Sequence, residues 1–90
     1  MTFTWDPRKD ATNRRKHGVG FREAATVLRD TLSTSYPDPM HSHGEQRYVT
    51  IGRSKLGRTL VVAHMERAGT IRIISGRLAT PRERRFYEEG

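Results

Sequence analysis

The sequence contains no cysteine, so a disulfide framework and thiolate metal ligands are both excluded. No apolar run approaches the roughly 18 to 20 residues of a membrane-spanning helix. The opening residues, MTFTWDPRKD, hold no apolar stretch fit for a signal peptide, and we therefore expect a cytoplasmic protein. Hydrophobic residues make up only 33% of the chain. We expect residues 1–90 to form one domain with a thin core and no separate cofactor domain.

Positive charge is what the sequence has in excess. Seventeen Lys and Arg residues stand against ten Asp and Glu residues, which gives a net charge of +7. The excess is spread along the whole chain, which places it on a folded surface instead of in a basic tail. RNA, DNA or an acidic protein are the natural partners of such a surface. The alternative is a basic surface without a polyanionic partner.

Two helices are predicted in the first third of the chain. Asp6 and Pro7 form a good helix start, and this helix should end near His17, with Gly18 as the residue after it. A second helix is predicted from apolar residues at helical spacing, with Gly20 as a weak N-cap. These apolar positions are Phe21, Ala24, Ala25 and Leu28.

Strands and one last helix follow. Residues 3–5 form a short extended piece, and a short strand is possible near 32–36. Three clearer strands are predicted within 47–54, 59–65 and 70–79, joined by turns short enough for antiparallel pairing. The segment TPRE at 80–83 is a capping box that starts a C-terminal helix. The expected fold is α+β, with an antiparallel sheet of three to four strands, two N-terminal helices and one C-terminal helix.

Two arginines stand in the most apolar strand, TIRIISGRLA. Side chains alternate along a strand, so Arg72 and Arg77, five residues apart, cannot share a face of a regular one. Either the two serve different surfaces, or a bulge near Ser75 and Gly76 brings them together. Alternation favours Arg72 as the structural member of the pair.

Three blocks in this order carry a family resemblance: WDPRKDATNRRKHGVGFREAATVL, EQRYVTIGRS and IRIISGRLATPRERRFYE. Together they resemble the BrnT toxins of bacterial type II toxin–antitoxin systems, over nearly the whole chain. The resemblance implies a RelE-like ribonuclease fold and translation arrest through RNA cleavage. It also implies a hetero-oligomer with a DNA-binding, BrnA-like antitoxin that inhibits the toxin. Two residues depart from the family pattern: Gly20 replaces a Ser-like cap, and Gly76 replaces Ala, which is expected to loosen its strand.

RNA cleavage without a metal needs a base for the 2′-OH, an acid for the leaving 5′ oxygen, and a positively charged group that stabilises the phosphorane formed between them. Arginine suits the last role because its planar fork binds two phosphate oxygens. With the resemblance, this chemistry gives the following catalytic candidates: Arg77, Arg72, Tyr87, His17 and Glu45. Lys16, Arg47 and Arg84 are the candidates for RNA or phosphate binding.

Each candidate also has a structural interpretation. His17 can satisfy free carbonyls at its helix end, and Tyr87 can pack on the sheet. The two strand arginines can pair with Glu45 or Glu83, and Glu45 can pair with Arg47. His64 lies in a strand that is apolar on both faces, which is typical of a core histidine.

No cofactor and no metal are expected. His41, His43 and Glu45 lie close together in HSHGE. Because the loop does not hold a third ligand in a fixed position, a metal site is disfavoured. A metal-independent ribonuclease toxin is therefore the leading hypothesis. The alternatives are a non-catalytic, basic nucleic-acid-binding module and a degenerate toxin that acts only in a repressor complex.

Overall fold

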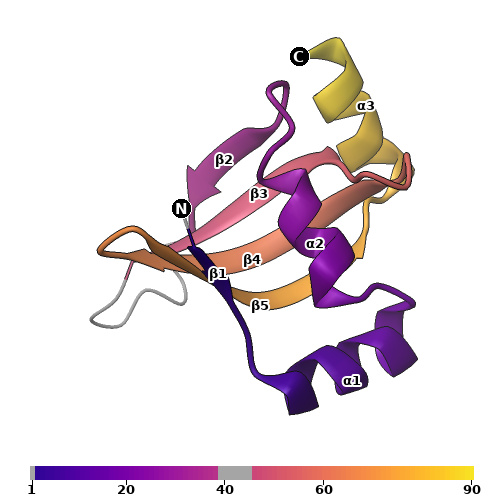
Figure 1. Cartoon of the computed structure of the whole chain (residues 1–90). Coiled ribbons are helices and arrows are strands. Elements are labelled where there is room, and N and C mark those ends of the chain that lie inside the picture. The colour runs from indigo at the N-terminus through magenta and orange to yellow at the C-terminus, as the bar shows by residue number, and fades with distance from the viewer. Residues whose placement is uncertain (1, 39–45) are drawn as a thin grey trace.

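A computed structural model describes residues 2–38 and 46–90 of the chain. Five strands form one sheet in the order β1-β5-β4-β3-β2, and three helices surround it (Figure 1). The elements in chain order are β1 (Thr2–Thr4), α1 (Pro7–His17), α2 (Phe21–Val27), β2 (Thr34–Pro37), β3 (Arg47–Arg53), β4 (Thr59–Arg67), β5 (Thr70–Leu78) and α3 (Pro81–Glu89).

The sequence predicted the α+β class and the order of helices correctly, but the sheet differs from the expected one in two respects. It has five strands instead of three to four, and it is mixed. The additional strand is β1, which pairs in parallel with β5, Phe3 lying opposite Ile71. Three residues are too few to show a strand periodicity, and their partner lies at the other end of the chain. The remaining pairs are antiparallel, as predicted.

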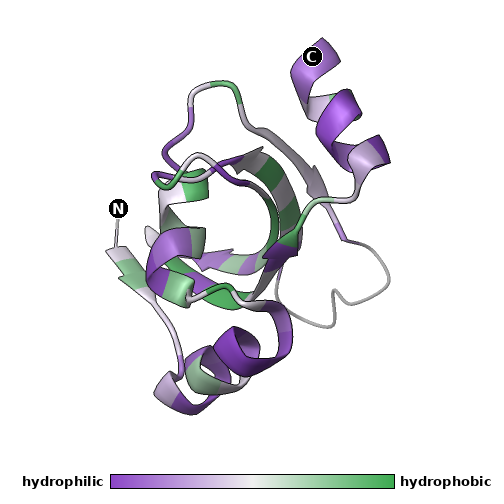
Figure 2. Cartoon of the chain, turned by 90° about the vertical axis from the view of Figure 1, so that its right-hand side faces the viewer, coloured by the Kyte–Doolittle hydropathy of each residue, from purple (hydrophilic) through white to green (hydrophobic). Residues whose placement is uncertain are grey.

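The core lies between α2 and one face of the sheet. Phe21, Ala24 and Val27 of α2 are fully buried and pack against apolar side chains of β4 and β5. Figure 2 shows this arrangement, with hydrophobic strands curling around the helix. Of the predicted apolar stripe, Phe21 and Ala24 are fully buried, whereas Ala25 and Leu28 are half-buried at the border of the core.

Helix α1 lies beside β5 and contributes little apolar surface. Asp6 caps its start by accepting a hydrogen bond from the Arg8 N–H at 2.8 Å, and Gly18 ends it with a φ of 69°. Its one buried side chain is Asn13. The Asn13 amide donates to the carbonyl oxygens of Gly76 at 2.7 Å and Val19 at 2.8 Å. The Asn13 amide thus supplies a hydrogen bond to the β5 backbone at Gly76, beyond the residues that pair with β1.

Both departures from the family pattern have a structural compensation. The Gly20 N-cap of α2 has no side chain, but the Asp10 carboxylate of α1 accepts the Phe21 N–H at 2.8 Å and caps the helix in its place. A Cβ at Gly76 would lie 3.2 Å from the Ala24 Cβ and 3.3 Å from a Val19 methyl. The glycine therefore permits close approach of helix and strand.

Helix α3 begins with the predicted capping box and stands apart from α1 and α2 (Figures 1 and 2). None of its residues is buried, and Phe86 is 57% exposed. Polar contacts attach it to the rest of the fold: Glu83 to Arg77, Tyr87 to Asp30, and Glu88 to Arg53. Within the described residues, no helix is long and apolar enough to cross a membrane.

Candidate functional site

A bulge in β5 places the two strand arginines on one face of the sheet. Arg72 lies opposite Met65, and Arg77 lies opposite Val61. These β4 partners are four residues apart on a regular strand and therefore share a face. Between them, Ile74 has no partner on β4, since the register passes from Ile73 to Ser75. The bulge interpretation is thus confirmed, with Ile74 as the additional residue.

A basic groove runs along the bulged edge of β5, between that strand and α1. Its cavity has a volume of about 310 Å³. We call it the α1–β5 groove, and it is lined by Arg8, Lys9, Thr12, Asn13, Lys16, His17, Ile74 and Ser75. Among these described residues there are three permanent cations and one imidazole, and there is no carboxylate. The groove is therefore suited to an anion.

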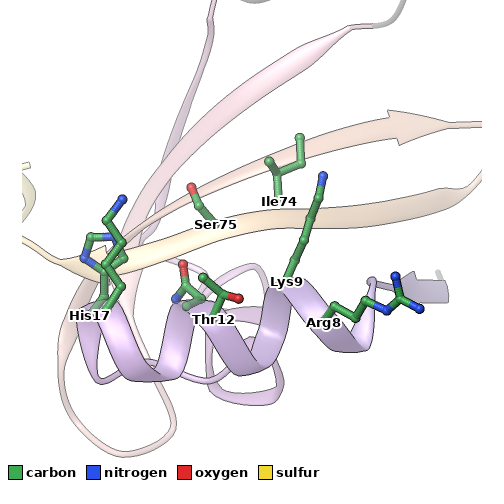
Figure 3. Close-up of a pocket in the computed structure, with 8 residues that line it drawn as sticks. Arg8, Lys9, Thr12, His17, Ile74 and Ser75 are labelled. Atoms are coloured by element: carbon green, nitrogen blue, oxygen red, sulfur yellow. The ribbon is translucent and has the colours of Figure 1, made fainter.

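The helical spacing of α1 explains how its side chains reach one groove. Lys9 precedes Asn13 by four residues, and Lys16 and His17 follow Asn13 by three and four, so these side chains flank Asn13 on one helix face. Asn13 holds this face against the β5 edge through its amide contacts. Figure 3 shows Lys9 and His17 rising from α1 towards the strand, with the Ser75 hydroxyl and Ile74 between them. A phosphate in the groove would have cationic groups on both sides.

Arg77 and Arg72 differ in their partners. The Arg77 guanidinium donates to both carboxylate oxygens of Glu83, at 2.8 and 2.9 Å. This fork lowers the pKa of Glu83 to about 2 and raises the pKa of Arg77. Arg72 is exposed and forms no hydrogen bond or ion pair with any described residue. Alternation along the strand therefore assigned the two roles wrongly: Arg77 is the ion-paired arginine.

Tyr87 forms no hydrogen bond with Arg77 among the described residues. Its hydroxyl donates to the Asp30 carboxylate at 2.6 Å, and the Arg53 guanidinium lies 5.8 Å from the centre of its ring. The hydrogen bond to Asp30 raises the pKa of Tyr87, so the phenol stays protonated at neutral pH. A protonated phenol can donate a proton but is a poor base.

Arg84 lies on α3 as well, but it lines a separate cavity. It lines a polar cavity of about 610 Å³ together with Arg53, Arg58 and Glu88. The structure thus separates three residues that the sequence placed in one cluster: Arg77 at Glu83, Tyr87 at Asp30, and Arg84 at this cavity.

The candidates at the start of β3 are only partly described. Arg47 lies half-buried, with its Nε 3.8 Å from the Asp38 carboxylate. Glu45, and with it the His41, His43 and Glu45 cluster, lies outside the described residues. In the rest of the chain no group of three potential metal ligands is found.

His64 is a core histidine, as predicted. It is 2% exposed, its Nε2 lies 2.7 Å from the Thr50 hydroxyl, and Tyr48 stacks on its ring. Burial lowers the pKa of His64 to about 4, so the ring is neutral at pH 7. It lies within the sheet core and lines no part of the α1–β5 groove.

The family of the chain follows from a comparison of its sequence with family models. Residues 5–83 match the model of the ribonuclease toxin BrnT of type II toxin–antitoxin systems. The chain belongs to the BrnT ribonuclease toxin family. No curated protein matches its sequence. Among solved structures, the fold is similar to that of the ribonuclease toxin BrnT of Brucella abortus, with a TM-score of 0.64 and 24% identity. That alignment covers 89% of this chain and 97% of the Brucella chain.

Several residues around these sites were not singled out from the sequence. Arg8 and Lys9 were given no role, although Lys9 precedes Lys16 by seven residues, a spacing that places the two on one helix face. Asp30, which holds Tyr87, lies in a polar segment without a clear pattern, and Arg53 lies at the end of a predicted strand, where it was not assigned a role. No local signal could have identified them, because their partners are distant in the chain.

Proposed function

We propose that this member of the BrnT family is a toxin that cleaves RNA without a metal and so arrests translation. In this proposal the α1–β5 groove binds the phosphate at the cleavage position. The observation that supports it most strongly is the lining of the groove: Arg8, Lys9, Lys16 and His17 converge on it without a carboxylate. Arg72, exposed at the edge of the same bulge, adds a planar guanidinium that can bind two phosphate oxygens.

The proposed reaction is an internal transfer at phosphorus. The 2′-oxygen attacks the phosphorus while its proton passes to a base, and the bond from phosphorus to the 5′-oxygen breaks as that oxygen receives a proton. The products are a 2′,3′-cyclic phosphate end and a free 5′-hydroxyl. His17, half-buried at one end of the groove, is assigned one of the two proton transfers, and Glu45 remains the candidate for the other.

Arg77 and Tyr87 have secondary roles in this proposal. The ion pair with Glu83 uses one N–H of each terminal nitrogen of Arg77 and offsets its charge, so Arg77 binds phosphate more weakly while the pair is formed. Tyr87, whose raised pKa keeps it protonated, can act only as a donor. Arg47 and Arg84 are assigned to flanking phosphates of the RNA, where single charges add affinity without taking part in chemistry.

A second candidate function is the binding of nucleic acid without cleavage. It is favoured by the carboxylates that engage Arg77 and Tyr87, since both residues are then occupied in the free protein. Such a protein would retain the basic groove and lack turnover. In either case the type II family implies a cognate antitoxin, and we propose that it is a BrnA-like, DNA-binding protein that forms a hetero-oligomer with this chain.

The test is single-turnover cleavage of RNA by the wild-type chain and by His17→Ala. If His17 transfers a proton, the rate should fall by about 10²-fold or more while RNA affinity changes little. Arg85→Gln is the matched control for altered charge, because Arg85 is exposed and does not line the groove. Cleavage should persist in EDTA and leave cyclic phosphate ends. Loss of activity in EDTA with recovery on adding a transition metal would refute the metal-free route.

Binding gives an independent measurement. Lys9→Gln and Lys16→Gln should each weaken binding of single-stranded RNA and flatten its salt dependence. On a log–log plot, each lost phosphate contact reduces the slope by about 0.7. RNA binding without cleavage by the wild-type chain would favour the second candidate function.

A further inference from the structure

A second groove lies on the outer side of α2, away from the α1–β5 groove. Two adjoining cavities form it, of about 450 and 590 Å³, and both are lined by Thr26 and Arg29. We call it the α2 groove. The first cavity reaches Phe3 and Trp5 beside β1, and the second reaches Leu32 beyond the end of α2. It shares no lining residue with the α1–β5 groove.

The floor of the α2 groove is the outer face of α2 together with the turn that follows the helix. Arg22, Ala25 and Thr26 share this helix face at positions i, i+3 and i+4, and Ala25 also packs on the border of the core. Small side chains occupy the centre of the floor, which permits close approach of another backbone. Arg22 marks one end of it, and Arg29, in the turn after α2, marks the other.

The charge of the floor is uncompensated. Arg22 and Arg29 are both exposed, and neither forms a hydrogen bond or an ion pair within the part of the chain that the structure describes. The Arg29 guanidinium lies over the Phe3 ring, 5.4 Å from its centre. No carboxylate lines the first cavity. The second cavity is lined by the carboxylate of Asp30, which already accepts hydrogen bonds from the Tyr87 hydroxyl and from two backbone N–H groups.

Apolar side chains accompany these charges. Phe3 and Trp5 are half-buried, and Trp5 sets its edge against Phe21 of the core at a centroid distance of 6.5 Å. Leu32 is 74% exposed. Arginine and aromatic residues next to an apolar contact form the composition that protein interfaces favour over the rest of a surface.

We propose that the α2 groove is the docking site of an acidic, amphipathic helix of the antitoxin. This inference rests on the proposed function, in that it requires an antitoxin to exist. A helix laid along α2 would place carboxylates seven residues apart opposite Arg22 and Arg29. Its apolar side chains would then meet Phe3, Trp5 and Leu32. The antitoxin would thus be held by a surface distinct from the groove that binds RNA.

The test uses the full chain and the product of the gene adjacent to it, co-expressed and purified as a complex. Arg22→Glu and Arg29→Glu should each weaken the complex by at least about tenfold, because each places a carboxylate against an acidic partner. Arg85→Glu, the same charge reversal at an exposed position outside the groove, should leave affinity unchanged. RNA cleavage by the isolated Arg22→Glu and Arg29→Glu variants should equal that of the wild type, which also shows that they fold.

The outcomes separate this inference from the proposed function. If the wild type cleaves RNA but Arg22→Glu and Arg29→Glu bind the antitoxin normally, docking at the α2 groove is refuted and the ribonuclease proposal stands. Slower cleavage or weaker RNA binding by these variants, with antitoxin affinity unchanged, would make the groove an RNA surface and also refute it. If the neighbouring product does not bind the wild-type chain at all, the inference fails. A wild type that binds antitoxin but does not cleave RNA refutes the nuclease alone.

Discussion

The ion pair between Arg77 and Glu83 allows the sharpest test of the structure. Glu83→Gln removes the negative charge but keeps a side-chain oxygen that can accept the Thr80 N–H, so the capping box of α3 is retained. The remaining oxygen can still accept from one terminal nitrogen of Arg77, without charge assistance, whereas the amide nitrogen cannot accept the second hydrogen bond, which is lost. The substitution therefore removes the charged fork that holds α3 to β5 and leaves the helix cap in place.

The expected magnitude follows from the pKa of Glu83. Its hydrogen bonds from Arg77 lower this pKa from 4.5 to about 2, an interval worth at most about 3.4 kcal/mol at 1.36 kcal/mol per pH unit. The Arg77 side chain is 43% exposed, so solvent screening reduces the net contribution to about 1 kcal/mol. In a domain of this size, 1 kcal/mol shifts the melting temperature by about 4–8 °C.

The lowered pKa of Glu83 also determines how its contribution to stability changes with pH. The folded state holds Glu83 charged more strongly than the unfolded state does, so its contribution is complete above pH 4.5 and is lost as the pH falls towards 2. Glu83→Gln should thus be about 1 kcal/mol less stable than the wild type at pH 7, and the difference should vanish near pH 2. The variant also leaves Arg77 without its carboxylate partner, and RNA affinity is expected to increase if this arginine reaches phosphate.

The measurement is urea unfolding of both proteins at pH 7, 4 and 2.5. Glu89→Gln, an exposed position on the same helix, is the control and should match the wild type throughout. A stability difference for Glu83→Gln that stays constant from pH 7 to pH 2.5 would show that the loss is not electrostatic, and the reasoning from the ion pair would then be wrong.

Two further predictions concern buried polar groups. Asn13→Ala should destabilise the fold by about 1–3 kcal/mol, because it leaves the backbone groups of Gly76 and Val19 without their partner; an unchanged melting temperature would mean that water replaces the amide. The pKa of His64 is lowered from 6.5 to about 4 by burial, so only the unfolded chain gains a proton in that interval, and the stability of the wild type should decline as the pH falls from 6.5 to 4. His64→Gln should reduce this decline in urea unfolding, and an equal decline in both proteins would exclude His64 as its source.

Part of the candidate site could be predicted from the sequence because its residues share one helix. Lys16 and His17 stand together at the end of α1, and both line the groove that the structure shows. The cluster expected around Arg77 could not be predicted in the same way. Tyr87 and Arg84 share the helix that contacts Arg77, but the orientation of that helix directs them to Asp30 and to a separate cavity.

The sequence by itself determined the local elements, because the interactions that start and end them span only a few residues. Asp6 with Pro7, Gly18, and the TPRE capping box all act within one helical turn, and α1 and α3 begin and end where these signals place them. Tertiary structure alone decided the parallel pairing of β1 with β5, whose strands come from opposite ends of the chain. It also selected the bulge at Ile74 that places Arg72 and Arg77 on one face. Strand alternation left that choice open, since the position of an unpaired residue depends on how β5 aligns with β4, and the side-chain pattern of one strand does not specify that alignment.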